Sequence, residues 1–269
     1  GNVALRVRES DDKDAMEVAG RGELPLGILI ETMRREGFEL SVSRPKVLLR
    51  KGAAGELEEP IEEVVIDVDE EHSGIVVQKM SERKAEMTEL KPSGGGRVRL
   101  VFHAPTRGLI GYQGELLTDT RGTAIMNRLF HGYAPHKGPI QGRRNGVLIS
   151  NDKGEAVAYA LWNLEDRGPM MIEPGWKVYP GMIVGEHTRD NDLIVNVLKG
   201  KQLTNIRTTS KDEAVRLTPP IKMTLEKALA YIEDDELVEV TPASIRLRKR
   251  LLDENDRKRA ERTKEAEAV

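Results

Sequence analysis

The chain has 269 residues, a length that predicts two domains or three small ones. It contains no cysteine, which excludes disulfides, zinc–cysteine sites and a cysteine nucleophile and predicts a reducing, cytoplasmic setting, and no apolar run reaches the roughly 18 residues of a membrane span. The 42 Lys and Arg residues nearly balance the 45 Asp and Glu residues, and a net charge of −3 argues by itself against a nucleic-acid partner.

The N-terminal segment predicts a strand, a helix and a second strand. Apolar and charged residues alternate over 3–9, which is typical of a half-buried strand, and the acidic stretch 9–17 predicts a loop. Apolar residues recur at i, i+3, i+4 and i+7 over 26–33, which predicts an amphipathic helix that ends near Gly37. Alternation resumes over 38–44 and predicts another strand.

The next segment predicts the order β-α-β-β-α-β of a split-βαβ domain. Its loop of glycines at 91–96 separates two central strands, and the helices are expected at 73–80 and 109–117. A weak internal repeat supports the assignment, because residues 20–40 and 106–126 share the order Arg-Gly, apolar helix, Gly, strand. The first copy then predicts the back half of a second such domain whose front half precedes residue 1, so we expect the chain to be a fragment.

From residue 136 the pattern changes to short strands separated by Gly and Pro, which is typical of a β-barrel-like domain. Residues 147–164 predict a hairpin, and we expect Trp162 and Trp176 to pack inside the barrel. One main helix follows, capped by Thr224, and the charged tail 253–269 predicts a frayed helix or a disordered end.

Together these patterns predict an α+β protein: two ferredoxin-like split-βαβ domains, the first incomplete, followed by a mixed and largely β-barrel-like domain with one main helix. The expected boundaries are 1–52, 53–135 and 136–269.

The near-zero net charge conceals an uneven distribution. Residues 56–71 hold nine acids and no base, whereas the basic clusters 199–211 and 245–250 hold no acid. Two basic clusters near the end of the chain indicate an anionic partner. An alternative is a protein-binding module in which the acidic 56–71 face recruits a basic protein.

Motifs for catalysis are missing from the sequence. No G-x-x-x-x-G-K-[ST] loop is present to hold nucleotide phosphates, and no G-x-S-x-G elbow marks a nucleophilic serine. The five histidines lack metal-binding spacing, since His131 and His136 suit neither one helix face nor one strand face. The adjacent carboxylates Glu165-Asp166 and Asp234-Asp235 are explained by surface solvation. We therefore expect no catalytic residue and no metal site. A stand-alone enzyme is a further alternative, which measurable nucleotide hydrolysis by the purified chain would support.

Several stretches resemble translational GTPases. GRGELPLGILIETMRREGFELSVSRPKV resembles the third domain of elongation factor G-type proteins, and EPIEEVVIDVDEEHSGIVVQKMSERKAEMTEL resembles their fifth. NGVLISNDKGEAVAYALWNLEDRG and MTLEKALAYIEDDELVEVTPASIRLRKR are similar to the BipA/TypA family, and 147–250 is the most specific part. Where elongation factor G-type fifth domains have Arg-Arg-Gly, this chain has Glu82-Arg83-Lys84-Ala85.

The resemblance implies the C-terminal half of a ribosome-associated GTPase with roles in large-subunit assembly, translation and stress adaptation. It implies a monomer without membrane contact whose partners are large-subunit ribosomal RNA, the acceptor end of an A-site tRNA and ribosomal proteins. No cofactor is expected on this chain, because GTP and Mg²⁺ would belong to the N-terminal half. The loop that the resemblance places at the RNA is 199–216.

The residue types of that loop fit RNA. Its cations and the backbone around Gly200 can bind phosphates, and its amide and hydroxyl side chains can bind ribose hydroxyls and base edges. The loop has no aromatic residue, so base stacking within it should be weak. The predicted RNA-binding residues are Lys199, Lys201, Gln202, Thr204, Asn205, Arg207, Thr208, Thr209, Lys211, Arg216, Arg246, Arg248, Arg250, Arg143 and Arg144.

Overall fold

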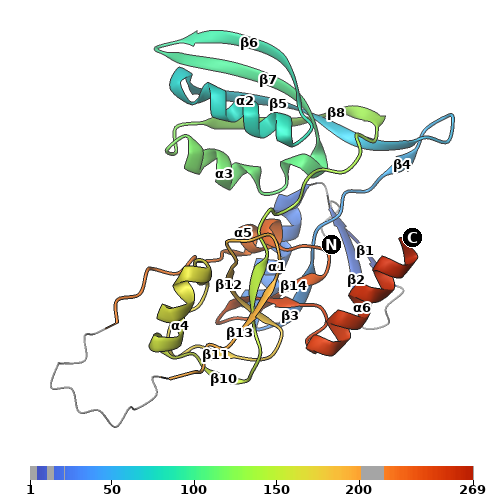
Figure 1. Ribbon diagram of the computed structural model, residues 1–269. Helices are drawn as coiled ribbons and strands as arrows, with labels where there is room; N and C mark the ends of the chain where they lie inside the picture. Colours follow the sequence, from blue (N-terminus) through green and yellow to red (C-terminus); the bar gives the residue numbers. More distant parts are fainter. Residues whose placement is uncertain (1–4, 11–14, 21, 201–214, 269) are drawn as a thin grey trace. The chain divides into compact units, whose positions relative to one another are not determined.

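The computed structural model describes residues 5–10, 15–20, 22–200 and 215–268 (Figure 1). The chain divides into two compact units. One combines residues 1–44 with 143–269 and is here called the discontinuous unit, and the other, residues 45–142, is called the inserted unit. The division into three domains at residues 52 and 135 stays a prediction.

The inserted unit has the predicted order β-α-β-β-α-β. Strand β5 pairs antiparallel with both β7 and β8, β7 pairs with β6, and the short β4 pairs with the start of β5. Single 3₁₀ turns, Glu70–His72 and Thr106–Leu109, precede the two helices. The elements are β4 (Arg50–Lys51), β5 (Leu57–Asp69), α2 (Ser73–Glu82), β6 (Glu86–Gly94), β7 (Arg97–Pro105), α3 (Tyr112–Asp119) and β8 (Ile125–Pro135).

Helices α2 and α3 lie over one face of this sheet (Figure 1). Alternation along the strands turns Val64, Ile66 and Phe102 toward those helices, where they are almost fully buried with Met80 and Tyr112. The residues between them on the same strands are polar or half-buried. The sheet therefore has one covered face and one face without a helix.

A six-stranded sheet organises the discontinuous unit, in the order β13-β9-β12-β15-β14-β3. Strand β13 runs parallel to β9, and the other neighbours are antiparallel. Within the described residues the sheet is open, with β13 and β3 at its edges, so the predicted barrel-like closure is wrong. The strands are β3 (Leu40–Ser43), β9 (Val147–Ser150), β12 (Met182–Glu186), β13 (Leu193–Val195), β14 (Glu236–Val240) and β15 (Ile245–Lys249).

Both faces of this sheet are covered, which explains why the runs VLIS and MIVG are apolar without alternation. On one face, Ile149 and Ile183 pack with Ile30 of α1 (Glu23–Arg35) and Ala228 of α5 (Leu225–Tyr231). On the other face, Leu148 and Val184 pack with Leu161 of α4 (Ala158–Leu164). As predicted, the Thr224 hydroxyl caps α5, accepting a hydrogen bond from Lys227 N at 3.2 Å.

The hairpin predicted over 147–164 is wrong in its second half. Only Gly154–Glu155 (β10) is extended there, paired with Lys177–Val178 (β11), and residues 158–164 form α4. Alanine-rich sequence favours a helix, and Ala160 and Leu161 are buried on one helical face. A 3₁₀ turn, Glu165–Arg167, follows this helix.

The N-terminal segment also differs from the expected partial split-βαβ domain. Strand β1 (Leu5–Glu9) pairs with β2 (Met16–Gly20), although Met16 and Glu17 were expected in a loop. Strand β3 pairs with β14 instead of a local neighbour. At the other end, the charged tail forms α6 (Glu254–Glu267), which Asp253 caps by accepting from two backbone N–H groups.

Candidate nucleic-acid interface

The predicted RNA loop is described only at its two ends. Lys199 and Arg216 are both exposed. The remaining loop residues of the prediction lie outside the described residues: Lys201, Gln202, Thr204, Asn205, Arg207, Thr208, Thr209 and Lys211.

Both described ends of the loop are anchored on one apolar cluster. Leu198 and Leu217 each pack against the cluster that contains Leu161 and Val184. Backbone hydrogen bonds add to the anchoring, since Val157 N donates to Val197 O at 3.0 Å and Thr218 N donates to Glu165 Oε1 at 2.7 Å. The loop therefore starts and ends at the same part of the discontinuous unit.

Two tryptophans beside these anchors are exposed, contrary to the expected barrel packing. The exposed fractions are 48% for Trp162 and 38% for Trp176. Trp162 lies on α4, where the Tyr159 ring is 6.3 Å from its ring, centroid to centroid. Trp176 O accepts a hydrogen bond from Ala156 N at 2.9 Å. Ala156 directly precedes Val157, whose N–H donates to Val197 O. Trp162 thus follows Leu161, a member of the cluster against which Leu198 and Leu217 pack, whereas the loop itself has no aromatic residue.

The arginines of 245–250 are partly neutralised by a glutamate on the neighbouring strand. Arg246 Nε and Arg248 Nε lie 3.3 and 2.9 Å from the two oxygens of Glu239, as ion pairs without hydrogen-bond geometry. Tyr179 Oη also donates to Glu239, at 2.7 Å, and burial together with this bond raises the pKa of Tyr179. Arg250 is exposed, with its guanidinium 3.4 Å from Asp234 O. Only part of this cluster's charge is available to a partner.

Arg143 is committed to the protein interior. Its guanidinium forms a bidentate pair with Glu236 at 2.7 and 3.0 Å, and also donates to Asn145 O and Tyr231 O. The Arg143 side chain is 11% exposed and that of Glu236 is fully buried. We therefore replace the predicted RNA contact of Arg143 by a structural role, whereas its neighbour Arg144 is exposed and stays a candidate.

Lys249, the central cation of the same basic cluster, is also buried. Its Nζ lies 2.6 Å from Asp192, 3.0 Å from Asp235 and 2.9 Å from Glu236. Burial opposes the charge of Glu236, but the hydrogen bonds of Arg143 and the charge of Lys249 outweigh it and hold the pKa of Glu236 below its usual value. Burial likewise opposes the charge of Lys249, yet these carboxylates raise its pKa.

The sequence contained a signal for this buried cation. Ile245, Leu247 and Lys249 alternate along β15, so Lys249 shares the inward face with two apolar residues. The same alternation places Arg246 and Arg248 on the opposite face of the strand. Asp235, which was expected only to solvate the surface, is one of the partners of Lys249.

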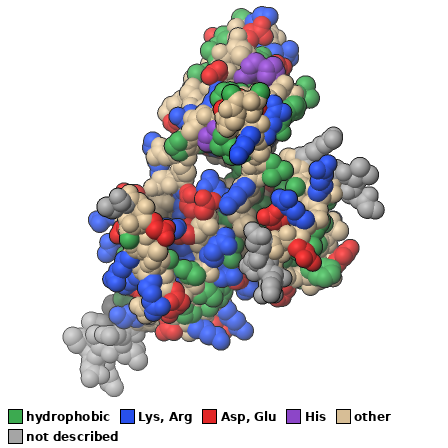
Figure 2. All heavy atoms as spheres, turned by 90° about the vertical axis from the view of Figure 1, so that its right-hand side faces the viewer, with side chains coloured by type: hydrophobic (Ala, Val, Ile, Leu, Met, Phe, Trp, Pro, Cys, Tyr) green, Lys and Arg blue, Asp and Glu red, His purple; other side chains and the backbone are tan. Residues whose placement is uncertain are grey.

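The acidic segment 56–71 is largely paired within the inserted unit. Arginines of the same unit neutralise most of it: Arg50 pairs with Glu58, Arg107 with Glu59, Arg128 with Glu62, Arg99 with Asp67 and Arg97 with Asp69. These pairs take up five of the nine acids, which reduces the charge that an acidic face could offer to a basic protein. Figure 2 shows Lys and Arg side chains over much of the discontinuous unit, interspersed with Asp and Glu.

Comparison with known families divides the chain close to the unit boundary. Residues 145–254 match the TypA/BipA C-terminal domain, and residues 56–144 match the elongation factor G C-terminus. No described helix is long and apolar enough to cross a membrane.

Three relatives show how far the similarity extends, and each is named large ribosomal subunit assembly factor BipA. The Salmonella typhimurium protein is 55% identical over 99% of this chain and 44% of its own length. The Escherichia coli K12 protein is 56% identical over 97% of this chain and 43% of its length, and the Bacillus subtilis protein 51% over 98% and 43%. The chain thus spans less than half of each relative. It belongs to the TypA/BipA family and carries the C-terminal domain of that family.

Proposed function

We propose that this chain is the ribosome-binding part of a cytoplasmic, ribosome-dependent GTPase that acts in large-subunit assembly, translation and stress adaptation. The name shared by its relatives supports the assembly role. GTP and Mg²⁺ would bind outside this chain, in the part of the relatives that it does not span. The partners would be large-subunit ribosomal RNA and the acceptor end of an A-site tRNA, with the protein acting as a monomer.

The observation that supports this proposal most is the anchoring of 199–216. Leu198 and Leu217 fix the described residues on either side of the segment to one buried cluster, and the sequence between them is rich in cations. Such a segment can neutralise phosphates and release their counterions. The exposed Lys199 and Arg216 would contribute at the base of the loop, and the polar residues within it would bond ribose 2′-hydroxyls and base edges.

The exposed tryptophans extend the proposed contact beyond charge. Trp162 and Trp176 offer exposed π-faces in the same unit as the loop, and stacking on an aromatic side chain is worth about 1–3 kcal/mol per base. We infer that an unpaired base, such as those near a tRNA acceptor end, stacks there while the loop holds the backbone.

Ribosome co-sedimentation across a salt series tests the proposal. If about four phosphates are contacted, log Kd should change with log salt with a slope of magnitude of about 3–4. The double variant Lys201→Ala with Arg207→Ala should bind more weakly at every salt and lower the slope by about 1.5–2, with an unchanged melting temperature.

A matched control removes the same charge elsewhere. Arg262→Ala with Lys264→Ala changes two exposed cations of α6 and should bind like the wild type. Equal weakening of both double variants would reduce the effect to net charge and contradict the loop assignment. Binding that survives RNase digestion of the ribosome would instead favour a protein partner.

A further inference from the structure

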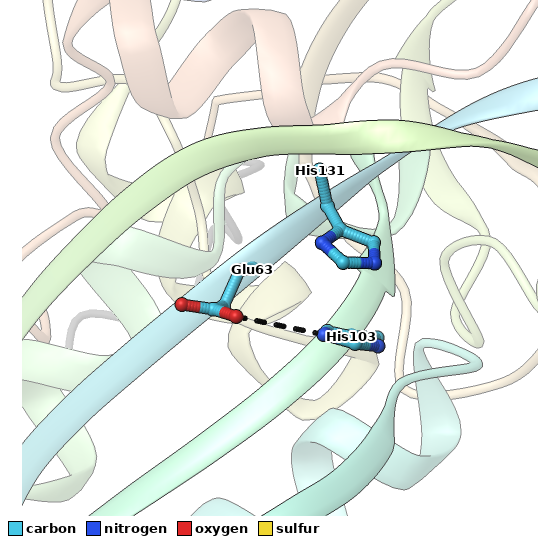
Figure 3. Close-up of side chains that lie close together, drawn as sticks. All are labelled: Glu63, His103 and His131. Carbon is cyan, nitrogen blue, oxygen red and sulfur yellow. Dashed lines mark ion pairs between the residues drawn. The ribbon is translucent and has the colours of Figure 1, made fainter.

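Three metal-ligating side chains meet on the helix-free face of the inserted unit's sheet. Glu63 lies on β5, His103 on β7 and His131 on β8, and Figure 3 shows the carboxylate and both imidazoles close together. Glu63 and His103 are direct cross-strand partners. The chain separates these residues by tens of positions, so their spacing along the sequence gave no sign of a site.

A bulge brings the third residue into place. Along β8, Gly132 pairs with Ile61 and Phe130 pairs with Glu62, so His131 has no partner in the register. Bulges of this kind re-aim a side chain. The His131 ring stacks on that of His103 with 4.1 Å between centroids.

The distances among these three side chains are too long for direct hydrogen bonds but leave room for a small cation between them. His103 Nε2 lies 3.6 Å from Glu63 Oε2, which is too long for a hydrogen bond. One potential ligand atom from each residue lies within 4.8 Å of the other two. Two ligands at about 2.0–2.1 Å from a tetrahedral ion are about 3.3 Å apart. The two imidazoles, which are stacked with an interplanar angle of 27°, would have to rotate out of the stack to point one nitrogen each at the ion.

We propose that Glu63, His103 and His131 bind a Zn²⁺ ion. Two imidazoles and one carboxylate are a donor set that zinc favours, whereas Mg²⁺ and Ca²⁺ prefer oxygen ligands. His131 is exposed and the Glu63 side chain is 44% exposed, so water can occupy the fourth position. The ion would join three neighbouring strands of the sheet.

A second cluster in the same unit, Asp69, Glu71 and His72, offers a useful contrast. Arg97 already pairs with Asp69 at 2.9 Å, which leaves that carboxylate less free for a cation. We therefore assign the ion to the His103–His131 cluster.

Calorimetric titration of the chain with ZnCl₂, repeated with Co²⁺ as a spectroscopic probe, tests the site. We expect one ion per chain, a visible absorption spectrum typical of four-coordinate Co²⁺, and a higher melting temperature with Zn²⁺. Loss of an outer partner alone weakens metal binding about 10- to 100-fold, so His131→Ala and Glu63→Gln should weaken it at least as much.

Two control variants make the result specific. Asn127→Ala changes an exposed residue of β8 without removing a ligand, and His72→Ala removes the histidine of the other cluster. Both should bind Zn²⁺ like the wild type. Wild-type binding by His131→Ala, loss of binding in His72→Ala, or no saturable uptake by the wild type would each overturn the proposal.

Discussion

Lys249 Nζ lies 2.9 Å from Glu236 Oε2, with side chains that are 3% and 0% exposed. A cation from the basic stretch 245–250 is therefore buried in the discontinuous unit, where it forms an ion pair. Arg143 binds both oxygens of the same carboxylate. Buried charges of this kind tolerate the loss of a partner poorly, because the remaining charge has no water to replace it.

Glu236→Gln should lower the free energy of unfolding of the discontinuous unit by about 3–5 kcal/mol at pH 7, since it leaves Arg143 and Lys249 without their shared counter-charge. Urea unfolding monitored by tryptophan fluorescence measures this, because both tryptophans lie in that unit.

The same variant has a distinct acid dependence. The pKa of Glu236 is held below its usual 4.5, so its ionisation stabilises the fold fully above about pH 4.5 and progressively less as the pH falls through the folded-state pKa. The wild type should lose stability over that acidic range, and Glu236→Gln should lose less. Identical pH slopes for the two proteins would contradict this assignment.

Arg143→Ala and Arg144→Ala should separate structure from binding at adjacent positions. Loss of the buried pair with Glu236 should lower the melting temperature by about 6–20 °C, whereas exposed Arg144 should leave it almost unchanged. Differential scanning calorimetry gives the comparison. If Arg144 contacts RNA, its variant alone combines an unchanged melting temperature with weaker ribosome co-sedimentation.

Trp162→Ala and Trp176→Ala should each weaken binding of single-stranded RNA if bases stack on these rings. A loss of about 1–3 kcal/mol corresponds to roughly 5- to 150-fold in Kd. The chain has only these two tryptophans, so quenching of their fluorescence by an RNA oligonucleotide reports on the contact directly. Phe38→Ala is the control, because it removes an exposed ring shortly after the end of α1. This variant should bind the RNA like the wild type.

Gly168→Ala should be clearly more destabilising than Gly175→Ala. Both glycines have positive φ, 147° and 86°, so each alanine is strained by about 1 kcal/mol. A Cβ at Gly168 would also stand 1.9 Å from Glu186 O, whereas one at Gly175 would meet nothing within 4 Å. Chemical denaturation of both variants isolates the clash, and equal losses would refute it.

Local patterns were sufficient for the inserted unit. Its strands alternate cleanly because one face is covered and the other is not, so residues such as Val64 and Ile66 identify the buried side from sequence alone. In the discontinuous unit the strands β9 and β12 lack alternation, and the sequence of α4 was predicted to be part of a hairpin. Pairings between distant segments, such as β3 with β14, leave no periodic signal.

The candidate site shows the same limit. Charge and the family resemblance selected Lys199 and Arg216, which are exposed. Charge also selected Arg143, whose partner Glu236 lies far along the chain. Likewise, Glu63, His103 and His131 come together only through strand register and a bulge. The sequence could indicate which residue types are able to bind a ligand. Which side chain each of them contacts could be known only from the fold.

The pairing of β3 with β14 sets a limit on dissecting this protein. A fragment restricted to the family-matched residues 145–254 would lack β3 and the Ile30 side chain from α1. It would expose the backbone edge of β14 and an apolar patch beside it, both of which invite self-association. A fragment designed to keep these contacts would instead join residues 22–44 to 143–252 through a linker in place of the inserted unit.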